Sequence, residues 1–548
     1  MNLNENSLNA VEGTQTQTMN GHSPLFDRLS TDGKPYWGYI TRYSPVIYQD
    51  INKQFADGIA DLIAKFNADG NWNMAEQWET IGKVPQVPYV YASVQETKTH
   101  LFLGYYFYHA RDDGPTTFDQ HENDLEGIMM AVRKDGNYGV PVAMETVYHS
   151  HFLRYRLQDS NVQPGYVGIE KTSVRFSEGT HPEIFISSNG SGDNHGHGVR
   201  AYTSSEDVGD DGIVYKFGEP SYPGQPTQFS PKWQHTYNYG ILPIDELWER
   251  KFNYYDTPFK SFGVFPNTKS SYGNANAPWN WSDTDQDGTL GMGVYFTDPA
   301  YLFDIDFNEL GTFSHEYVHN PYWTHKVTLK SVTPKVYKDP SNNLPDIYIS
   351  MDTYSKSGKR YISEKVWMKE DAALNVPHTV IFGGDQKTAN TTFSEPTNTL
   401  HIAVSNDNPR LWLEVKDYDP SDADDDMGSI VIPLNTGNIV GKADLSEAII
   451  DYEVQSNSSF PLAPEGVYIY TDANFSGTSK QLTSSVTNFK DINMNDAVSS
   501  IKIVGPYDVV GYSDANFTGH SATLVTTDNL SSTNVGNDKM SSIRITRR

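Results

Sequence analysis

Cysteine is absent from all 548 residues of this sequence. Disulfide bonds and thiolate-bound metal ions are therefore excluded, and outside a cell such a chain would depend on packing and bound ions for stability. The sequence also lacks an apolar run of the roughly 20 residues that a membrane-spanning helix needs. The N-terminal segment has neither the basic start nor the apolar centre of a recognisable signal peptide. We interpret residues 1–23 as a flexible tail, and still expect a secreted, extracellular protein.

Positive charge is scarce in this chain. Lys and Arg together number 41 against 69 Asp and Glu, which gives a formal net charge of −28. Proteins that bind a phosphate backbone do so with Lys and Arg side chains that replace condensed counterions, so we expect no nucleic-acid partner. Many of the acidic residues stand in short Asp/Asn clusters, which present the oxygen ligands that hard cations prefer. The composition therefore favours several Ca²⁺ ions as cofactors.

Aromatic residues are plentiful and helical patterns are few. Phe, Tyr and Trp make up 13% of the chain, and short β-branched runs alternate with Gly, Pro, Asn and Asp, which is typical of strands. At roughly 100–200 residues per domain, the length predicts three or four units. We predict a mainly β multidomain protein with these parts: a tail (1–23), a β-rich N-terminal sandwich with a few helices (24–323), a second β-sandwich (324–452), a linker (453–464) and a C-terminal repeat domain (465–548).

Two local patterns in the N-terminal region predict specific elements. Apolar residues at helical spacing between Asp50 and Phe66 predict an amphipathic helix. The alternation of apolar and acidic residues from Asp304 to Phe307 instead predicts a strand.

The C-terminal segment contains an internal repeat. The stretch from Tyr470 to Gly477 recurs as the stretch from Tyr512 to Gly519, and a later Asn-Asp-x-x-Ser-Ser element recurs at the same offset. Each copy of the second element runs into a short alternating stretch that predicts a strand. The chain therefore ends in two copies of one supersecondary unit.

These two elements resemble the motifs of microbial βγ-crystallins, which fold as double Greek keys. The glycine that closes the first element allows a tight hairpin, because its backbone angles are forbidden to residues with side chains. The resemblance implies two calcium sites, each supplied by one copy of the Asn-Asp-x-x-Ser-Ser element. The implied ligands are Asn495, Asp496 and Ser499 in one site and Asn537, Asp538 and Ser541 in the other.

The middle region carries a second acidic motif. Asp417-x-Asp419 is followed after five residues by Asp425, and Gly428 stands three positions further on. This spacing resembles the third calcium loop of a C2 domain, and the segment around Asp346 resembles the first. The resemblance implies a C2-like sandwich that binds calcium through these aspartates and, through the ion, anionic lipid headgroups.

The N-terminal region contains a dense run of acidic residues that begins at His121. On a regular strand, Asp124 and Glu126 would share a face that His121 does not, so only a bend would bring the three together. The run resembles the His-x-(His/Gly)-Asp-Trp-Glu signature of necrosis- and ethylene-inducing-like proteins and of the vacuolar protein sorting-associated 62 family, with Leu125 in place of Trp. The resemblance implies a divalent ion held by His121, Asp124 and Glu126 beside a glycolipid headgroup.

A further acidic run has the opening spacing of an EF-hand. Asp283, Asp285 and Asp287 precede Gly288, but Val294 stands where an EF-hand has its bidentate glutamate. The run therefore predicts an isolated Asp-rich calcium turn at most.

The sequence also contains the pattern His-Glu-x-x-His. On a helix, His315 and His319 would both face one Zn²⁺ ion, and Glu316 would act as the catalytic base that activates water. Asn320-Pro321 follows at once and disfavours that helix.

Two functions therefore stay open. The preferred one is a non-enzymatic, calcium-dependent protein of lytic or toxin-like type that binds a membrane lipid or glycan surface. The alternative is a secreted zinc metallopeptidase with calcium-binding targeting domains. The sequence does not predict an oligomeric state.

Overall fold

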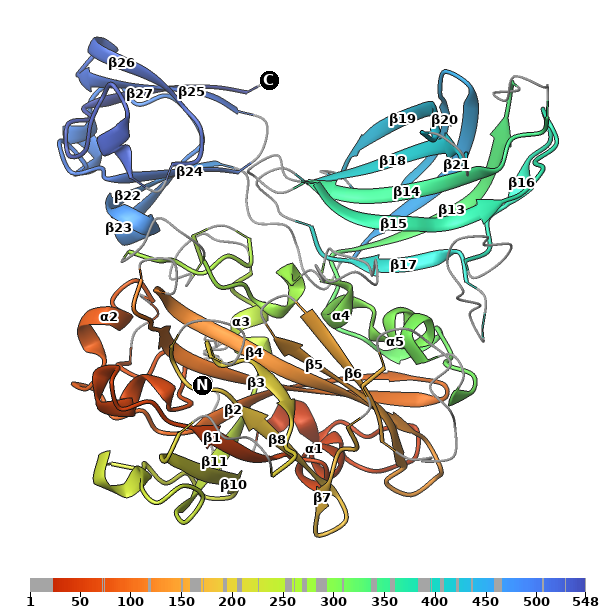
Figure 1. Cartoon of the computed structure of the whole chain (residues 1–548). Helices are drawn as coiled ribbons and strands as arrows, with labels where there is room; N and C mark the ends of the chain where they lie inside the picture. Colours follow the sequence, from red (N-terminus) through yellow and green to blue (C-terminus); the bar gives the residue numbers. More distant parts are fainter. Residues whose placement is uncertain are drawn as a thin grey trace, which may run out of the picture.

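The computed structural model describes residues 23–70, 72, 74–116, 120–148, 151–157, 169–170, 172–190, 195–204, 209–224, 226–251, 259–260, 262–268, 274–281, 293–307, 310–336, 343–354, 360–382, 395, 397–404, 409–419, 423–434, 437–457, 466–504, 507–527 and 529–547. The chain is mostly β, as predicted, and its strands form several separate sheets (Figure 1).

The N-terminal region is organised around one hydrogen-bonded path of strands in the order β6-β5-β4-β3-β2-β11-β10-β1-β8-β7, with β9 and β12 paired at its sides. The bounds of these strands are β1 Val46–Asp50, β2 Tyr89–Thr97, β3 His100–Asp112, β4 His121–Arg133, β5 Val140–Tyr148, β6 His151–Arg156, β7 Phe176–Ser177, β8 His181–Ile186, β9 Val199–Ala201, β10 Gly212–Phe217, β11 Thr236–Pro243 and β12 Tyr317–His319.

Both faces of this sheet are buried, and β3 shows why. Its 13 residues are all buried, and successive side chains enter two different cores. Leu103 and Tyr105 pack into one core. Strands from both ends of the hydrogen-bonded order, such as β5 and β8, also contribute side chains to this core, so the sheet curves around it. Phe102 and Tyr106 pack on the other side. A strand covered on both faces reads as a continuous apolar run, which is what the sequence has here.

Short helices cover the two faces. Helix α1 (Tyr36–Arg42) packs against the enclosed core through Tyr36, Tyr39 and Ile40. The other face is covered by three helices that precede the middle region in the chain. Their bounds are α3 Asp245–Trp248, α4 Val294–Thr297 and α5 Pro299–Phe307; α2 spans Gln77–Thr80. None of the helices within the described residues is both long and apolar enough to cross a bilayer.

Two predicted N-terminal elements differ in the structure. Between Asp50 and Phe66 the only helix is η2 (Ala56–Asp61), a short 3-10 helix broken by positive φ angles at Asp57 and Gly58. Asp304–Phe307, predicted as a strand, is the last turn of α5. Nearly every residue of α5 is buried, including Asp304 and Asp306. The alternation of acidic and apolar residues therefore does not separate a buried face from an exposed one, and it does not indicate a strand here.

The middle region is a β-sandwich of two antiparallel sheets. One has the order β16-β13-β21-β20 with β17 paired to β13, and the other has the order β15-β14-β18-β19. Leu411, Leu413 and Val415 alternate inward from β18, as expected for a sandwich strand. The bounds are β13 His325–Pro334, β14 Ile347–Tyr354, β15 Arg360–Lys369, β16 His378–Thr379, β17 Thr399–Ile402, β18 Arg410–Asp417, β19 Asp425–Pro433, β20 Ile439–Asp444 and β21 Ala448–Ser456.

The C-terminal region contains two three-stranded sheets with the same order, β23-β22-β24 and β26-β25-β27. Each half lends a segment to the other, because Val486 pairs with Ile543 and Thr527 pairs with Ile501. Both halves also share one hydrophobic core. The bounds are β22 Gly466–Asp472, β23 Ser476–Leu482, β24 Ser500–Val504, β25 Tyr507–Asp514, β26 Thr518–Leu524 and β27 Ser542–Arg547.

The N-terminal region and the sandwich meet at a buried carboxylate. Asp298, which is 2% exposed, follows α4 and accepts hydrogen bonds from the backbone N–H (2.8 Å) and Nδ1 (3.0 Å) of His401 in β17. The Tyr317 hydroxyl donates to its other oxygen at 2.8 Å. Figure 1 shows α4 and α5 between the N-terminal sheet and β17.

Candidate cation sites

The C-terminal repeat builds two equivalent folded hairpins. Gly477 and Gly519 both have positive φ (75° and 78°), and a Cβ atom at either position would collide with the side chains of the preceding strand. Glycine is therefore required at both positions, as the repeat predicts.

The Asn-Asp-x-x-Ser-Ser elements meet across the two halves. The Ser499 hydroxyl donates to Asp538 Oδ1 at 2.8 Å, and the Ser541 hydroxyl donates to Asp496 Oδ1 at 3.1 Å. The sequence prediction grouped Ser499 with Asp496 and Ser541 with Asp538, one site in each copy. In the structure each serine faces the aspartate of the other copy, because the two halves exchange segments. The calcium ligand sets stay a prediction.

The two asparagines hold the aspartates from the other side. Asn495 donates to Asp496 Oδ2 at 2.6 Å, and Asn537 donates to Asp538 Oδ2 at 3.1 Å. Both aspartates have a φ of 52° and exposed side chains, whereas Ser499 is buried. Each group therefore brings together a carboxylate, a hydroxyl and a carboxamide, a set of side chains that suits Ca²⁺.

The sandwich gathers its aspartates at one end of a sheet. Asp417 is buried and accepts a hydrogen bond from the backbone N–H of Asp346 at 2.6 Å, and Asp425 is its partner on the neighbouring strand. The backbone N–H of Asp419 donates a hydrogen bond to Asp424 Oδ1 at 3.1 Å. Within the described residues these carboxylates do not form a set of three whose oxygens approach within 4.8 Å. Calcium binding here stays a prediction.

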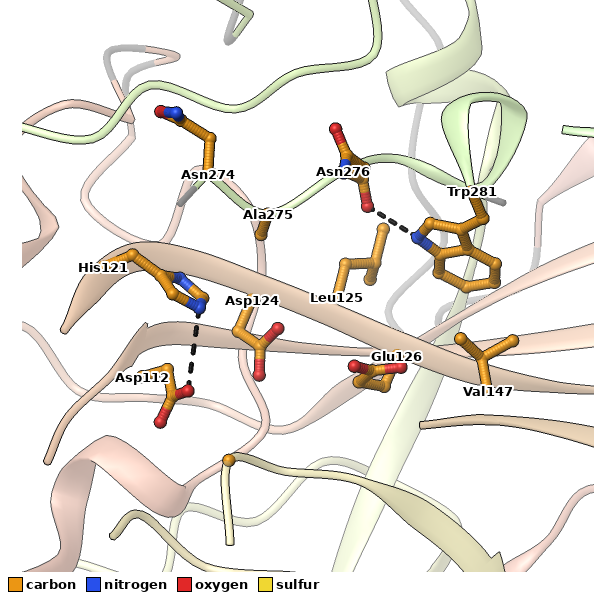
Figure 2. Close-up of a pocket in the computed structure, with 11 residues that line it drawn as sticks. Asp112, His121, Asp124, Leu125, Glu126, Val147, Asn274, Ala275, Asn276 and Trp281 are labelled. Atoms are coloured by element: carbon orange, nitrogen blue, oxygen red, sulfur yellow. Dashed lines mark hydrogen bonds and ion pairs between the residues drawn. The ribbon is translucent and has the colours of Figure 1, made fainter. Parts of the chain in front are cut away.

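A cavity of about 160 Å³ in the N-terminal region brings together all three residues predicted there. His121, Asp124 and Glu126 line it from β4, and Asp112 lines it from the end of β3 (Figure 2). His121 Nε2 lies 3.6 Å from Asp112 Oδ2. Trp281 lies on the opposite side and donates from its indole N–H to the backbone oxygen of a neighbouring residue.

A bend at Asn123 explains why His121 lies with the acids. Asn123, the third residue of β4, has a φ of 61°, which interrupts the alternation of side chains between the two faces. Its side chain is fully buried, donates to the backbone oxygens of Met74 and Pro266, and accepts from the Tyr108 hydroxyl at 2.7 Å. Glu122 points elsewhere and accepts from the backbone N–H of Thr268 at 2.7 Å.

The acids of the cavity have opposite pKa shifts. Burial raises the pKa of Asp112 to about 7, against the effect of the nearby His121 and His197. Burial also opposes ionisation of Asp124, but a hydrogen bond from His197 outweighs it and lowers the pKa of Asp124 to about 2. In turn, burial disfavours the His197 imidazolium, but hydrogen bonds to Asp124 and Asp61 raise its pKa to about 10. The hydrogen bond from His197 therefore favours the ionised form of Asp124.

Sequence reasoning missed Asp112 and His197. Asp112 is the cross-strand partner of His121, so an antiparallel pairing of the two β-rich runs would have located it. His197 arrives from a loop far along the chain, and nothing near Asp124 in the sequence indicates its approach.

Ligand atoms of His109, Asp124 and His197 lie within 4.8 Å of one another, the one such group among the described residues. The two imidazole rings are stacked, with centroids 3.9 Å apart and planes 6° apart. Ring-nitrogen lone pairs lie in the ring plane, so two parallel stacked rings cannot direct them at a common ion. We therefore interpret this cluster as support for Asp124.

The other predicted metal residues fall into two groups. Asp283, Asp285 and Asp287 lie outside the described residues. His315, Glu316 and His319 are described, but Tyr317–His319 is strand β12 and not a helix.

The histidines of the His-Glu-x-x-His pattern have separate partners. His315 Nε2 lies 2.9 Å from Asp304 Oδ2, and the His319 ring stacks on Tyr36 at 5.2 Å. Glu316 pairs with Lys98. The two imidazoles therefore face different groups, and among the described residues they belong to no set of three ligand atoms within 4.8 Å. The predicted zinc geometry is not formed.

Comparison with known proteins identifies the C-terminal region. Residues 466–546 match the family described as Beta/Gamma crystallin. Comparison with curated proteins returned no match. Among solved structures, a βγ-crystallin domain from Flavobacterium johnsoniae is 34% identical and covers 15% of this chain and 97% of its own, with a TM-score of 0.14.

Two further solved structures are similar to part of this chain. A βγ-crystallin from Ciona intestinalis is 26% identical and covers 15% of this chain and 98% of its own, with a TM-score of 0.14. A βγ-crystallin domain from Clostridium beijerinckii is 31% identical and covers 15% of this chain and 97% of its own, also with a TM-score of 0.14. The assignment of residues 466–546 rests on the family match.

Proposed function

Because residues 466–546 form a βγ-crystallin domain, we propose that the chain is a calcium-dependent, non-enzymatic protein that binds a surface outside the cell. The observation that carries this proposal is the crossed pairing of the repeat elements. Ser499 with Asp538, and Ser541 with Asp496, form two oxygen-rich groups at the surface. Each group would bind Ca²⁺ through its carboxylate and hydroxyl oxygens.

The N-terminal cavity supplies a second kind of cation position in this proposal. Asp112, Asp124 and Glu126 offer carboxylate oxygens, and His121 offers an imidazole, around a space large enough for a hydrated divalent ion. All three acids are at most 7% exposed, and buried carboxylates gathered in one cavity repel one another unless a cation neutralises them. An ion there would leave coordination positions for oxygens of a bound headgroup.

The surface that we propose as target is a membrane lipid or glycan, and the action is of lytic or toxin-like type. The net charge of −28 favours recognition through a bridging cation over direct attraction to anionic headgroups.

Calcium titration of the full chain tests this proposal. Ca²⁺ should raise the melting temperature in proportion to the logarithm of its free concentration, because it binds the folded state. Sedimentation with liposomes that contain anionic lipid and glycolipid should require Ca²⁺ and be abolished by EGTA. If Ca²⁺ changes neither the melting temperature nor sedimentation, the proposal is wrong.

A charge-matched pair of variants controls the titration. Asp496→Asn with Asp538→Asn removes the carboxylates of both crystallin groups and should remove most of the calcium-dependent stabilisation. Asp491→Asn with Asp508→Asn removes the same charge from exposed positions of the same domain and should leave it intact.

A further inference from the structure

His197 lies directly behind Asp124, on the side away from the cavity. The ring is completely buried, and its Nδ1 lies 2.8 Å from Asp124 Oδ2. The opposite nitrogen, Nε2, lies 3.3 Å from Asp61 Oδ1 and 3.2 Å from the amide of Asn189. The ring is therefore held at both ends, and among the described residues its bond toward the cavity goes to one oxygen of Asp124.

The groups behind His197 are themselves fixed. Asp61 is fully buried and accepts hydrogen bonds from the backbone N–H groups of Asn52 (2.7 Å) and Asn189 (2.6 Å). The His109 ring covers one face of the His197 ring. His197 also has a φ of 58°, an uncommon angle for a residue with a side chain, which the surrounding contacts maintain. A ring held in this way cannot turn when its neighbour binds a ligand.

We propose that His197 is a positioning residue: it clamps Oδ2 of Asp124 so that the other carboxylate oxygen faces the cavity and receives the cation. This inference rests on the proposed function of the cavity and assigns a role to a residue that does not touch the ion. A carboxylate without such a partner rotates between orientations, and binding an ion must then order it. Outer contacts that orient a metal ligand commonly change metal affinity by roughly 10–100-fold.

Two substitutions of His197 distinguish a role in orienting Asp124 through a hydrogen bond from a role in packing alone. In His197→Asn the side-chain amide occupies the place of Nδ1, so it can still donate to Asp124, and Asn tolerates the positive φ. In His197→Gln the amide reaches the place of Nε2 and retains the contact with Asp61, but the donor to Asp124 is lost. The positioning role predicts that Asn preserves cation affinity and Gln does not.

Tb³⁺, which substitutes for Ca²⁺, is the probe for this test. Trp281 lines the cavity and can sensitise bound Tb³⁺, whereas residues 466–546 contain no Trp. The part of the sensitised emission that is lost in His121→Gln reports the cavity. For that part, His197→Gln should weaken binding by about 10–100-fold and His197→Asn by less than about threefold.

Each outcome of the titration decides something. Equal binding by the Asn and Gln variants, whether both are weakened or neither, overturns the positioning role while the cation site stands. If the unmodified chain shows no emission that His121→Gln removes, the cavity binds no ion, and both the proposed cation position and this role fail.

A measurement on the unmodified chain covers the case in which His197→Gln does not fold. A crystal structure with Tb³⁺ bound should show one Asp124 oxygen on the ion and Oδ2 still within hydrogen-bond distance of His197 Nδ1. Direct coordination by His197, or a broken Asp124–His197 hydrogen bond, would overturn the inference.

Discussion

At the scale of single residues, Asn123 decides which side chains form the N-terminal cavity. Its φ of 61° interrupts the alternation of β4 and places His121 on the side of Asp124 and Glu126. The angle is maintained by three hydrogen bonds of its buried side chain, to Met74, Pro266 and Tyr108. A carboxamide is needed here because it both donates and accepts.

We predict that Asn123→Ala destabilises the N-terminal region by about 2–4 kcal/mol. The change leaves buried polar partners unsatisfied and keeps a positive φ that alanine adopts less readily than asparagine. Urea unfolding measures the loss. Asn137→Ala, at an exposed turn, is the control and should change stability by less than about 0.5 kcal/mol. Equal stability of the two variants would contradict this account of the bend.

At the scale of elements, the exchange of segments between the two halves of the crystallin domain determines which side chains share a calcium group. The backbone N–H of Asp496 donates to the oxygen of Met540 at 3.2 Å, and that of Asp538 donates to the oxygen of Val498 at 3.1 Å. Each loop is thus attached to the other half of the domain before any ion binds. Side chains of one repeat are therefore held beside side chains of the other.

A double-mutant cycle on calcium affinity tests this pairing. Ser499→Ala and Asp538→Asn should be coupled by roughly 0.5–2 kcal/mol because the two side chains share one group. Ser499→Ala and Asp496→Asn should be additive within about 0.5 kcal/mol, since they belong to different groups. The reverse result would restore the grouping by sequence copy.

The start of β3 gives a second prediction at this scale. His100 is 3% exposed, stacks on Phe313 at 4.3 Å, and its Nδ1 lies 2.8 Å from the Thr99 hydroxyl. Burial lowers the pKa of His100 from 6.5 to about 3. The folded state therefore favours the neutral ring. Below pH 6.5 the unfolded state takes up a proton that the folded state does not, so the free energy of unfolding decreases as the pH falls from 6.5 towards 3.

The expected acid sensitivity is large enough to measure. When the pH is lowered from 7 to 5, protonation of His100 in the unfolded state alone should decrease the free energy of unfolding by about 2 kcal/mol. Urea unfolding at both pH values should show a smaller pH-dependent loss for His100→Gln than for the unmodified chain. Parallel losses in the two proteins would show that His100 is not responsible.

At the scale of the whole molecule, the buried Asp298 joins the N-terminal region to the sandwich. Burial opposes its charge, but His401 outweighs this effect and lowers the pKa of Asp298. The carboxylate accepts from donors on both sides of the junction, Tyr317 on one and His401 on the other. A neutral amide would turn one acceptor into a donor that faces existing donors.

Asp298→Asn should therefore loosen the junction. Leaving buried donors without their acceptor typically costs about 1–3 kcal/mol each. In differential scanning calorimetry we expect the N-terminal region and the sandwich to unfold at more widely separated temperatures than in the unmodified chain. Glu453→Gln, which breaks the half-exposed pair with Lys330, should cost less than about 1 kcal/mol. Unchanged calorimetric profiles for Asp298→Asn would mean that the junction does not couple the two parts.

The sequence by itself determined the mainly β composition and the crystallin repeat, because strand alternation and glycine-dependent hairpins are local properties. It also predicted His121, Asp124 and Glu126 as candidate ligands, since they are neighbours in the chain. Only the tertiary structure decided that Asn123 bends β4, that Ser499 faces Asp538 instead of Asp496, and that His197 supports Asp124. It likewise gave His315 and His319 different partners, Asp304 and Tyr36, and placed Tyr317–His319 on a strand. The physical reason is common to all of these: which side chains meet across strands depends on pairing and burial of segments far apart in the chain, and local patterns do not contain that information.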